Sequence, residues 1–412
     1  MSQRKQRPST SSNLNSDLYH YTPPNPGVPY VEQQKPKGPI YLMIFFLLVF
    51  TLALIFRFVL APIHTDPKDN TQLKSRDKVS SSSLENSSVN PSGSNSPFSP
   101  DSEKNLSSLT SGQFIRFREK DISDKSLLDL DDVPAQSALC IDLKTGEVLF
   151  AKDSNAQIPP ASIAKLITAD YALTLFHPED LIYVDVETLQ MVPEDSTMAW
   201  IQSGVYSVKN LIEGMLVPSG NDAAYALAVA CARHKQGLDV SSESEENETA
   251  LPASEALKYF ADDLRAYLDQ LGLEDTLLRD PSGFRSDDYS TARDLAVAAT
   301  ELIQQDWILD ITKESVYPSE FPDGFVAEWT NTNLCLNESS AWYDPNIFGL
   351  KTGTLPEAAN LITLWSRGDH PYLVITLGSK DNDQRYESNA LICQALLLQE
   401  NPHEAQDLNE GD

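Results

Sequence analysis

An unbroken apolar stretch near the N-terminus constrains this 412-residue chain more than any other feature. Residues 40–61 read IYLMIFFLLVFTLALIFRFVLA, and Arg57 is the one charged side chain among them. As a helix this stretch would span ~33 Å, enough to cross a bilayer core of ~30 Å. A cleavable signal peptide would have a shorter apolar stretch and a small-residue cleavage site. We therefore expect a transmembrane anchor here, with a helix buried in a soluble domain as the alternative.

The sequence on both sides of the apolar stretch is typical of disordered chain. Residues 1–39 are rich in Pro, Ser, Asn and Gln, and residues 62–115 contain runs such as SSSLENSSVNPSGSNSPFSP. These compositions cannot bury enough apolar surface to offset the entropy lost on ordering. We expect a disordered tail over 1–39 and a flexible tether over 62–115. Five Lys and Arg residues precede the anchor and four follow within 20 residues, so the positive-inside rule barely decides its orientation.

Negative charge is concentrated beyond the tether. The chain has 31 Lys and Arg against 60 Asp and Glu, a net charge of −29. Residues 1–115 hold 11 basic and 8 acidic side chains, which leaves 20 and 52, or −32, for residues 116–412. Such an excess argues against a nucleic-acid partner, because a nucleic-acid binder must neutralise phosphates. Four scattered cysteines without a C-x-x-C pair argue against a zinc ribbon or a disulfide scaffold.

Residues 116–400 predict a single α/β domain. Residues 137–152 indicate two strands around a tight turn at 144–146, and a block of helices follows, interrupted by an acidic surface insertion at 236–253. Three more strands are expected at 347–355, 360–367 and 371–379, and a last helix at 387–399 precedes an acidic tail at 401–412. The expected architecture is a five-stranded, mainly antiparallel sheet with flanking helices and a helical subdomain.

The motifs in the sequence favour a reactive serine that is activated by a group other than histidine. The six histidines form no HExxH pair, and the chain has neither a G-x-G-x-x-G nor a G-x-S-x-G sequence. Metal, dinucleotide and Ser-His-Asp chemistry therefore lose support, and no metal or cofactor is expected. A serine hydroxyl then needs another base to remove its proton.

Ser162 and Lys165 supply such a pair at the start of an apolar helix. Residues i and i+3 of a helix share a face, and the helix N-terminus favours developing negative charge. A lysine surrounded by apolar side chains has a lowered pKa and can act as a neutral base. The alternative is a capping serine beside a lysine that reaches to solvent. Other Ser-x-x-Lys sequences fall in the tail and tether, which lack the rigidity that a site requires.

Two further motifs follow in the expected domain. Ser219-Gly220-Asn221 lies in a tight turn between helices, where its side chains are expected to point into a cleft. The alternative is a helix N-cap formed by Asn221 or Asp222, and the two are compatible because capping would leave Ser219 free to relay a proton. Residues 351–354, Lys-Thr-Gly-Thr, lie in a strand, where Gly353 permits the close approach of a ligand backbone. Lys351 would supply positive charge for a substrate carboxylate, and nearby N–H groups could line an oxyanion site. A strand glycine at a bulge is the alternative.

These motifs and their surroundings resemble the D-alanyl-D-alanine carboxypeptidases, low-molecular-mass penicillin-binding proteins of the serine peptidase S11 type. The resemblance covers roughly residues 130–399 and rests on TGEVLFAKDSNAQIPPASIAKLITA, LVPSGNDAAYALA, DPSGFRSDDYSTARDLA and GLKTGTLPEAANLI. It implies a β-lactamase/transpeptidase-like fold. Many members continue into a C-terminal β domain and have a cleavable signal. Here we expect no C-terminal β domain, and an uncleaved N-terminal anchor.

The resemblance also implies a two-step acyl transfer. Ser162 would attack the penultimate D-Ala carbonyl of a peptidoglycan stem pentapeptide while Lys165 takes its proton, and water would later hydrolyse the acyl-enzyme. Ser219 would relay a proton to the leaving D-Ala, and Asn221 would hold both the substrate amide and Lys165.

The same resemblance implies contacts to the terminal carboxylate. Lys351 and Thr352 would orient that carboxylate, and the N–H groups of Ser162 and Thr354 would form the oxyanion hole. Arg293 is a weaker candidate for carboxylate contact, with a structural pair to Asp294 as its alternative.

Two other functions share these motifs. A serine β-lactamase must deacylate penicillin quickly, and its usual Glu-x-x-x-Asn motif has no convincing counterpart here. A penicillin-sensing or wall-binding domain without hydrolysis is the non-enzyme alternative. The resemblance implies peptidoglycan stem peptides as substrate and β-lactams as covalent inhibitors. Since peptidoglycan is outside the cell membrane, it also implies a single-pass protein with a cytoplasmic N-terminus and an extracytoplasmic catalytic domain.

Overall fold

The computed structural model describes residues 114–126, 133–243 and 251–400 of the chain. The predicted tail, anchor and C-terminal acidic tail, and all but the last two residues of the predicted tether, lie outside these ranges. Of the helices within these ranges, none has the length and apolar character needed to cross a membrane.

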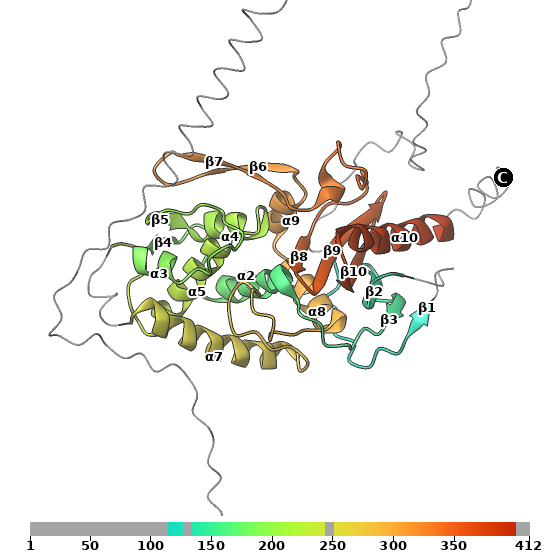
Figure 1. Ribbon diagram of the computed structural model, residues 1–412, viewed down its shortest axis with the longest axis horizontal. Coiled ribbons are helices and arrows are strands. Elements are labelled where there is room, and N and C mark those ends of the chain that lie inside the picture. Colours follow the sequence, from blue (N-terminus) through green and yellow to red (C-terminus); the bar gives the residue numbers. More distant parts are fainter. Residues whose placement is uncertain (1–113, 127–132, 244–250, 401–412) are drawn as a thin grey trace, which may run out of the picture. The chain divides into compact units, whose positions relative to one another are not determined.

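A six-stranded antiparallel sheet forms the centre of the described domain (Figure 1). Its strands follow the order β1-β3-β2-β10-β9-β8. Their bounds are β1 Lys125–Ser126, β2 Ser137–Asp142, β3 Val148–Lys152, β8 Lys351–Leu355, β9 Ala358–Arg367 and β10 His370–Ser379. Five of them confirm the expected strands and their antiparallel pairing. The sixth, β1, is a two-residue edge strand, too short to produce a pattern of alternating side chains in the sequence.

The two faces of the sheet pack against different helices. On β2, Leu139 and Ile141 face a core shared with α2 (Ala164–Leu175) and α8 (Ala292–Leu302). The alternate residues Ala138 and Cys140 face a second core with α10 (Asn382–Glu400), which lies across β9 and β10 in Figure 1. A strand buried on both sides explains why its sequence is continuously apolar rather than alternating.

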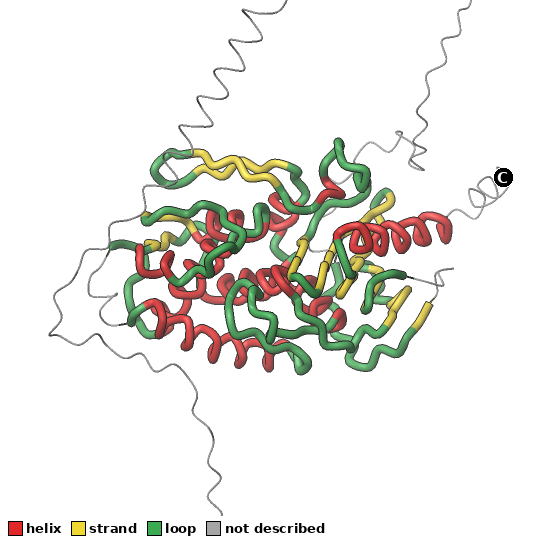
Figure 2. The backbone as a smooth tube through the Cα atoms, viewed as in Figure 1, coloured by secondary structure: helices red, strands yellow, loops and turns green. Residues whose placement is uncertain are grey.

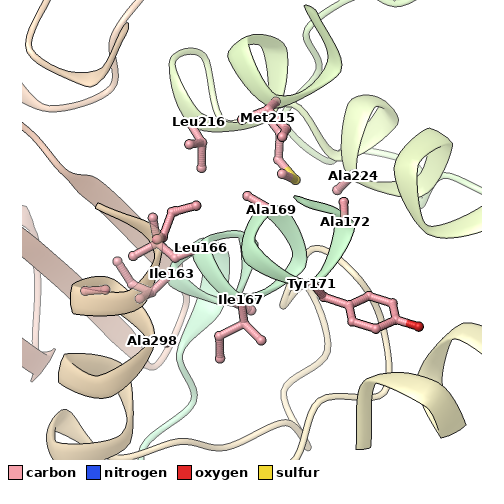
Figure 3. Packing of buried hydrophobic residues seen from close by; sticks show 14 of the residues in the cluster. Ile163, Leu166, Ile167, Ala169, Tyr171, Ala172, Met215, Leu216, Ala224 and Ala298 are labelled. Carbon is pink, nitrogen blue, oxygen red and sulfur yellow. The ribbon is translucent and has the colours of Figure 1, made fainter. Parts of the chain in front are cut away.

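Helix α2 lies in the middle of the helical block. Figure 3 shows its apolar side chains meeting residues of the neighbouring helices, among them Met215 and Leu216 of α4 (Val208–Leu216), Ala224 of α5 (Asn221–Lys235) and Ala298 of α8. Helix α7 (Ala253–Leu271) packs against α5 at the edge of this block. The expected block of helices and the last helix are therefore present, and the Thr291 side chain caps α8 by accepting a hydrogen bond from the Asp294 N–H.

Several short elements were not predicted from the sequence. They include two small antiparallel sheets, separate from the central one in Figure 2. The first pairs β4 (Leu181–Val184) with β5 (Gly204–Ser207), and the second pairs β6 (Val316–Glu320) with β7 (Val326–Thr330). The remaining short helices are α3 Val186–Gln190, α9 Asp306–Thr312 and the 3-10 turns η3 Ala161–Ile163 and η4 Leu334–Leu336.

The loop before α8 packs directly against the turn η3. Gly283 in this loop has φ +69°, and a Cβ built on it would lie 2.0 Å from the backbone oxygen of Ala161 and 2.8 Å from the Ala164 side chain. On the same loop, the Pro281 carbonyl accepts a hydrogen bond of 2.7 Å from Thr168 of α2. A residue with a side chain therefore does not fit at position 283 without displacing η3.

We predict that Gly283→Ala destabilises the protein much more than a matched change at Gly237. Both glycines have positive φ, but nothing lies within 4 Å of a Cβ at Gly237. Gly237→Ala should lower the free energy of unfolding by about 1–2 kcal/mol, the cost of left-handed backbone with a side chain. Gly283→Ala should cost at least twice as much, measured by denaturant unfolding. Equal losses would show that the close approach to Ala161 has no energetic weight.

Candidate active site

Two sequence motifs, Ser-x-x-Lys and Ser-x-Asn, meet at the buried amine of Lys165. Its Nζ lies 2.8 Å from Ser162 Oγ, 2.7 Å from Asn221 Oδ1 and 3.4 Å from Ser219 Oγ. Ser162 and Lys165 are three residues apart along η3 and α2, which places both side chains on one face. The structure therefore brings together residues that are 54 and 56 positions apart in the sequence.

The turn that carries Ser162 is held against two adjacent strands of the sheet, β8 and β9. Asn360 of β9 donates hydrogen bonds of 2.8 and 3.0 Å to the carbonyls of Pro159 and Pro160. A Cβ on Gly353 of β8 would lie 2.6 Å from the Pro160 oxygen. Gly353 thus permits a close approach of the protein's own backbone at the turn of Ser162. The expected bulge at this position is absent from the described pairing of β8 with β9, which runs without a shift.

Neither Asn221 nor Asp222 is the N-cap residue of the helix that follows the Ser219 turn. Gly220 is the N-cap residue of α5, whereas Asn221 is directed to Lys165. The Asp222 carboxylate accepts hydrogen bonds from the N–H groups of Ala199 and Ile201, both at 2.8 Å, as well as from Ala223. The alternative in which Asn221 or Asp222 is the N-cap of this helix is therefore wrong. Asp222 instead joins the motif to the loop before β5, and Ser219 itself is held at φ +66°.

Burial sets the electrostatic state of Lys165. The side chain is fully buried, and this desolvation lowers the pKa of its amine to about 7, against the opposing charges of Asp280 and Asp222. Both carboxylates hydrogen-bond elsewhere, since Asp280 accepts from Ser282 and from the backbone of its own loop. A lysine amine with a pKa near neutrality is uncharged often enough to accept a proton from the hydroxyl 2.8 Å away.

Lys351 lies at the start of β8 and is also fully buried. Burial is the main cause that lowers the pKa of its amine, and the charges of Lys165 and Arg385 act in the same direction. Its Nζ donates a hydrogen bond of 3.0 Å to the Thr352 carbonyl. The Thr352 hydroxyl lies 2.6 Å from the Thr332 hydroxyl. The sheet side of the site thus presents an amine and a hydroxyl group along one strand.

Arg385 lies beside β8, and the sequence analysis did not predict a place for it in the site. Its guanidinium donates to the Gly353 carbonyl at 3.1 Å and to Thr354 Oγ1 at 2.9 Å, and its Nε is buried without a hydrogen-bond partner among the described residues. It lies in the first turn of α10, which begins at Asn382, five residues before the predicted start. The stretch KDNDQR carries no apolar periodicity that would have placed it on a helix.

Arg293 is not brought to the cluster. Its guanidinium donates to the carbonyls of Glu119 and Gly272 and to Asp294 Oδ1, at 3.0, 2.7 and 2.6 Å. These contacts tie the start of α8 to two loops and match the structural alternative considered for this residue. A contact from Arg293 to a substrate carboxylate has no support in this geometry.

The chain was compared with protein families and with known proteins. The family model for peptidase S11, D-alanyl-D-alanine carboxypeptidase, matches residues 124–237 and 250–381. D-alanyl-D-alanine carboxypeptidase DacF of Bacillus subtilis is 26% identical over 258 residues, covering 61% of this chain and 59% of the relative. DacA of Escherichia coli is 26% identical over 275 residues, covering 63% and 60%. The chain thus spans about three fifths of the length of these relatives.

Solved structures agree with the fold. The Streptomyces K15 DD-transpeptidase superposes with a TM-score of 0.55 at 23% sequence identity, covering 65% of this chain and 98% of that one. The expected transpeptidase-like arrangement of an antiparallel sheet with flanking helices is therefore confirmed. Because the family model covers more than half of the chain, the protein belongs to the S11 peptidases, the D-alanyl-D-alanine carboxypeptidase family.

Proposed function

We propose that this protein is a serine D,D-carboxypeptidase that removes the terminal D-Ala from peptidoglycan stem pentapeptides through an acyl-enzyme on Ser162. The observation that carries the proposal is the buried Lys165 amine, in hydrogen-bond contact with the hydroxyl of Ser162 and with Asn221. Membership of the S11 family supports the choice of substrate. Ser162 is the proposed nucleophile and Lys165 the proposed base.

Acylation begins with the Lys165 amine. As Ser162 Oγ attacks the carbonyl of the penultimate D-Ala, its proton passes to the neutral Nζ over 2.8 Å. The backbone N–H groups of Ser162 and Thr354 are assigned to the oxyanion that forms. Ser219 lies 3.4 Å from Lys165 Nζ and relays the proton to the nitrogen of the leaving D-Ala. A water molecule then hydrolyses the ester and releases the shortened peptide.

Residues on the sheet side of the site, across from Lys165, are assigned to substrate binding. Lys351 and Thr352 of β8 are assigned to the terminal carboxylate, and Arg385 adds a positive charge beside Thr354. Asn221 holds the substrate amide through the part of its side chain that Lys165 does not use. Gly353 contributes by allowing β8 to lie against the turn of Ser162, which sets the distance between carboxylate and nucleophile.

The pH dependence of acylation tests the role of Lys165. Since the amine must be unprotonated to accept the Ser162 proton, the acylation rate should rise with pH and reach half its maximum near the pKa of about 7. Asp280→Asn removes a negative charge that favours the protonated amine, so its midpoint should move to lower pH. The measurement is the rate of labelling by a fluorescent penicillin between pH 5 and 9.

Asp287→Asn is the matched control for that experiment. Asp287 lies in the same loop but is exposed and pairs with Arg285 and Arg279. Its neutralisation should leave the midpoint unchanged. A flat pH profile in the wild type, or equal midpoints for the wild type and Asp280→Asn, would contradict the assignment of Lys165 as the base.

Release of D-Ala tests the activity itself. The detergent-solubilised full chain should release D-Ala from a stem pentapeptide, and Ser162→Ala should lower that rate by a factor of about 10³ or more. Ser154→Ala serves as a control, because this buried serine precedes η3 but makes no contact with Lys165. Free D-Ala is measured with an amino-acid oxidase assay. A wild-type protein that releases none would exclude the proposed carboxypeptidase.

Penicillin distinguishes the β-lactamase alternative in the same preparation. A carboxypeptidase should form an adduct on Ser162 that persists for many minutes, visible as a mass increase on the intact protein. Rapid turnover of penicillin with only a transient adduct would favour the β-lactamase. A stable adduct without D-Ala release would favour the penicillin-sensing domain.

We also propose that residues 40–61 anchor the protein in the cell membrane, with the N-terminus cytoplasmic and the catalytic domain outside. The support is the length and apolar character of the segment together with the location of the proposed substrate. Residues 62–115 would then separate the domain from the bilayer.

Deletion of residues 40–61 should move the protein from the membrane pellet to the soluble fraction after cell lysis. The matched control deletes the same number of residues from the tether, 80–101, and should remain in the pellet. External protease should digest the catalytic domain of the full chain in intact spheroplasts. Retention of the first variant in the pellet, or complete protection from protease, would refute the anchor or its orientation.

A further inference from the structure

Thr332 forms hydrogen bonds to both sides of the proposed active site, the helical side that carries Ser219 and the sheet side that carries Thr352. Its backbone N–H donates to the Val217 carbonyl at 3.3 Å, at the end of α4 and two residues before Ser219. Its side-chain hydroxyl lies 2.6 Å from the Thr352 hydroxyl on β8. One residue therefore connects the Ser219 turn on the helical side with the Lys-Thr-Gly strand on the sheet side.

The segment around Thr332 is fixed by further hydrogen bonds. Asn331 Nδ2 donates to the Thr312 carbonyl at 3.1 Å, and Asn333 Nδ2 donates to the Gly349 carbonyl at 3.0 Å. The Tyr386 hydroxyl, from α10, donates to the Thr332 carbonyl at 3.3 Å. Asn331 and Asn333 are buried, whereas Thr332 between them is partly exposed. The backbone is thus anchored on both sides of a side chain that reaches accessible space.

The Thr332 and Thr352 hydroxyls share one hydrogen bond, and its direction decides which of the two protons is free to bind a substrate. Each hydroxyl carries one proton, and either of the two can donate across the 2.6 Å contact. If Thr352 donates to Thr332, its oxygen presents lone pairs to an approaching carboxylate, which is unfavourable. If Thr332 donates instead, the Thr352 proton is available for a charge-assisted hydrogen bond to that carboxylate. The chain of two hydroxyls then strengthens by mutual polarisation.

We propose that Thr332 is a positioning residue that directs the Thr352 hydroxyl proton to the terminal carboxylate of the substrate, and so gives the enzyme its preference for a free carboxylate over an amide. This inference rests on the proposed carboxypeptidase function. Lys351 and Arg385 lie on the same side of the site, but their hydrogen bonds to the strand go to the Thr352 carbonyl and to Gly353 and Thr354, not to the hydroxyl pair. The direction of the Thr352 proton therefore depends on Thr332.

The experiment compares two substrates in four forms of the full chain. The substrates are a peptide ending in D-Ala-D-Ala with a free carboxylate and the same peptide with a C-terminal amide. The forms are the wild type, Thr332→Val, Thr332→Ser and Thr330→Val. Valine retains the shape of threonine without the hydroxyl, serine retains the hydroxyl, and Thr330 is an exposed threonine two residues away at the end of β7.

Thr332→Val should lower kcat/KM for the free-carboxylate peptide by about five- to tenfold, the effect of losing one neutral hydrogen bond. The preference for carboxylate over amide should fall by a similar factor. Thr332→Ser should restore both values to within about twofold, and Thr330→Val should change neither. Acylation by benzylpenicillin and by its methyl ester supplies the same ratio where turnover of the amide peptide is slow.

The outcomes separate this inference from the proposed function. An equal loss on both substrates in Thr332→Val, or an unchanged rate on both, would overturn the role of Thr332 while leaving the carboxypeptidase intact. A Thr332→Ser variant as impaired as Thr332→Val would also overturn it, since the hydroxyl would then not be the active group. A wild type without D-Ala release would overturn the proposed function and this inference together.

Discussion

The buried amine of Lys165 is the group on which the rest of the site depends. A charged ammonium without water is costly, so its surroundings must either neutralise it or lower its pKa. Asp280 and Asp222 are close enough to act on it through their charge, yet their oxygens accept N–H and O–H groups of nearby loops instead. Direct ion pairs would have held the lysine protonated. The same two carboxylates thus fix the loops around the site and leave the amine near neutrality.

Backbone strain accompanies this arrangement and is maintained by close packing. Ala161 and Ser219 have φ of +50° and +66°, a region that costs side-chain-bearing residues about 1–3 kcal/mol each. Each lies next to a contact that only glycine permits, with Gly283 against Ala161 and Gly220 against Ala199. Since these contacts leave no room for the backbone to relax, the strained residues keep the orientation that places Ser162 and Ser219 beside Lys165.

The sequence predicted the sheet, the main helices and the three residues that meet at Lys165, because each is encoded locally. Strand and helix patterns, turn glycines and short motifs all extend over a few consecutive residues. Thr332 and Arg385 escaped prediction because they belong to no short motif, and their contacts to Thr352, Thr354 and Gly353 of β8 span 20, 31 and 32 positions from stretches without periodicity. Arg293 shows the converse, since a basic residue in a polar run looks reactive until its backbone partners at Glu119 and Gly272 are seen.

The net negative charge of the domain is compatible with a site for an anionic substrate. Exposed and buried carboxylates differ in how strongly solvent screens their charge. Most acidic side chains in the described ranges are exposed, and charges in solvent are screened beyond a Debye length of ~8 Å at physiological ionic strength. Buried Asp280 and Asp222 are screened far less and act directly on Lys165. On the sheet side of the site, the charges that act most on Lys351 are those of Lys165 and Arg385, and with burial they lower the pKa of its amine. The local potential there is consequently set by the Arg385 guanidinium and the neighbouring hydroxyls, and the exposed negative charge elsewhere on the domain is largely screened from it.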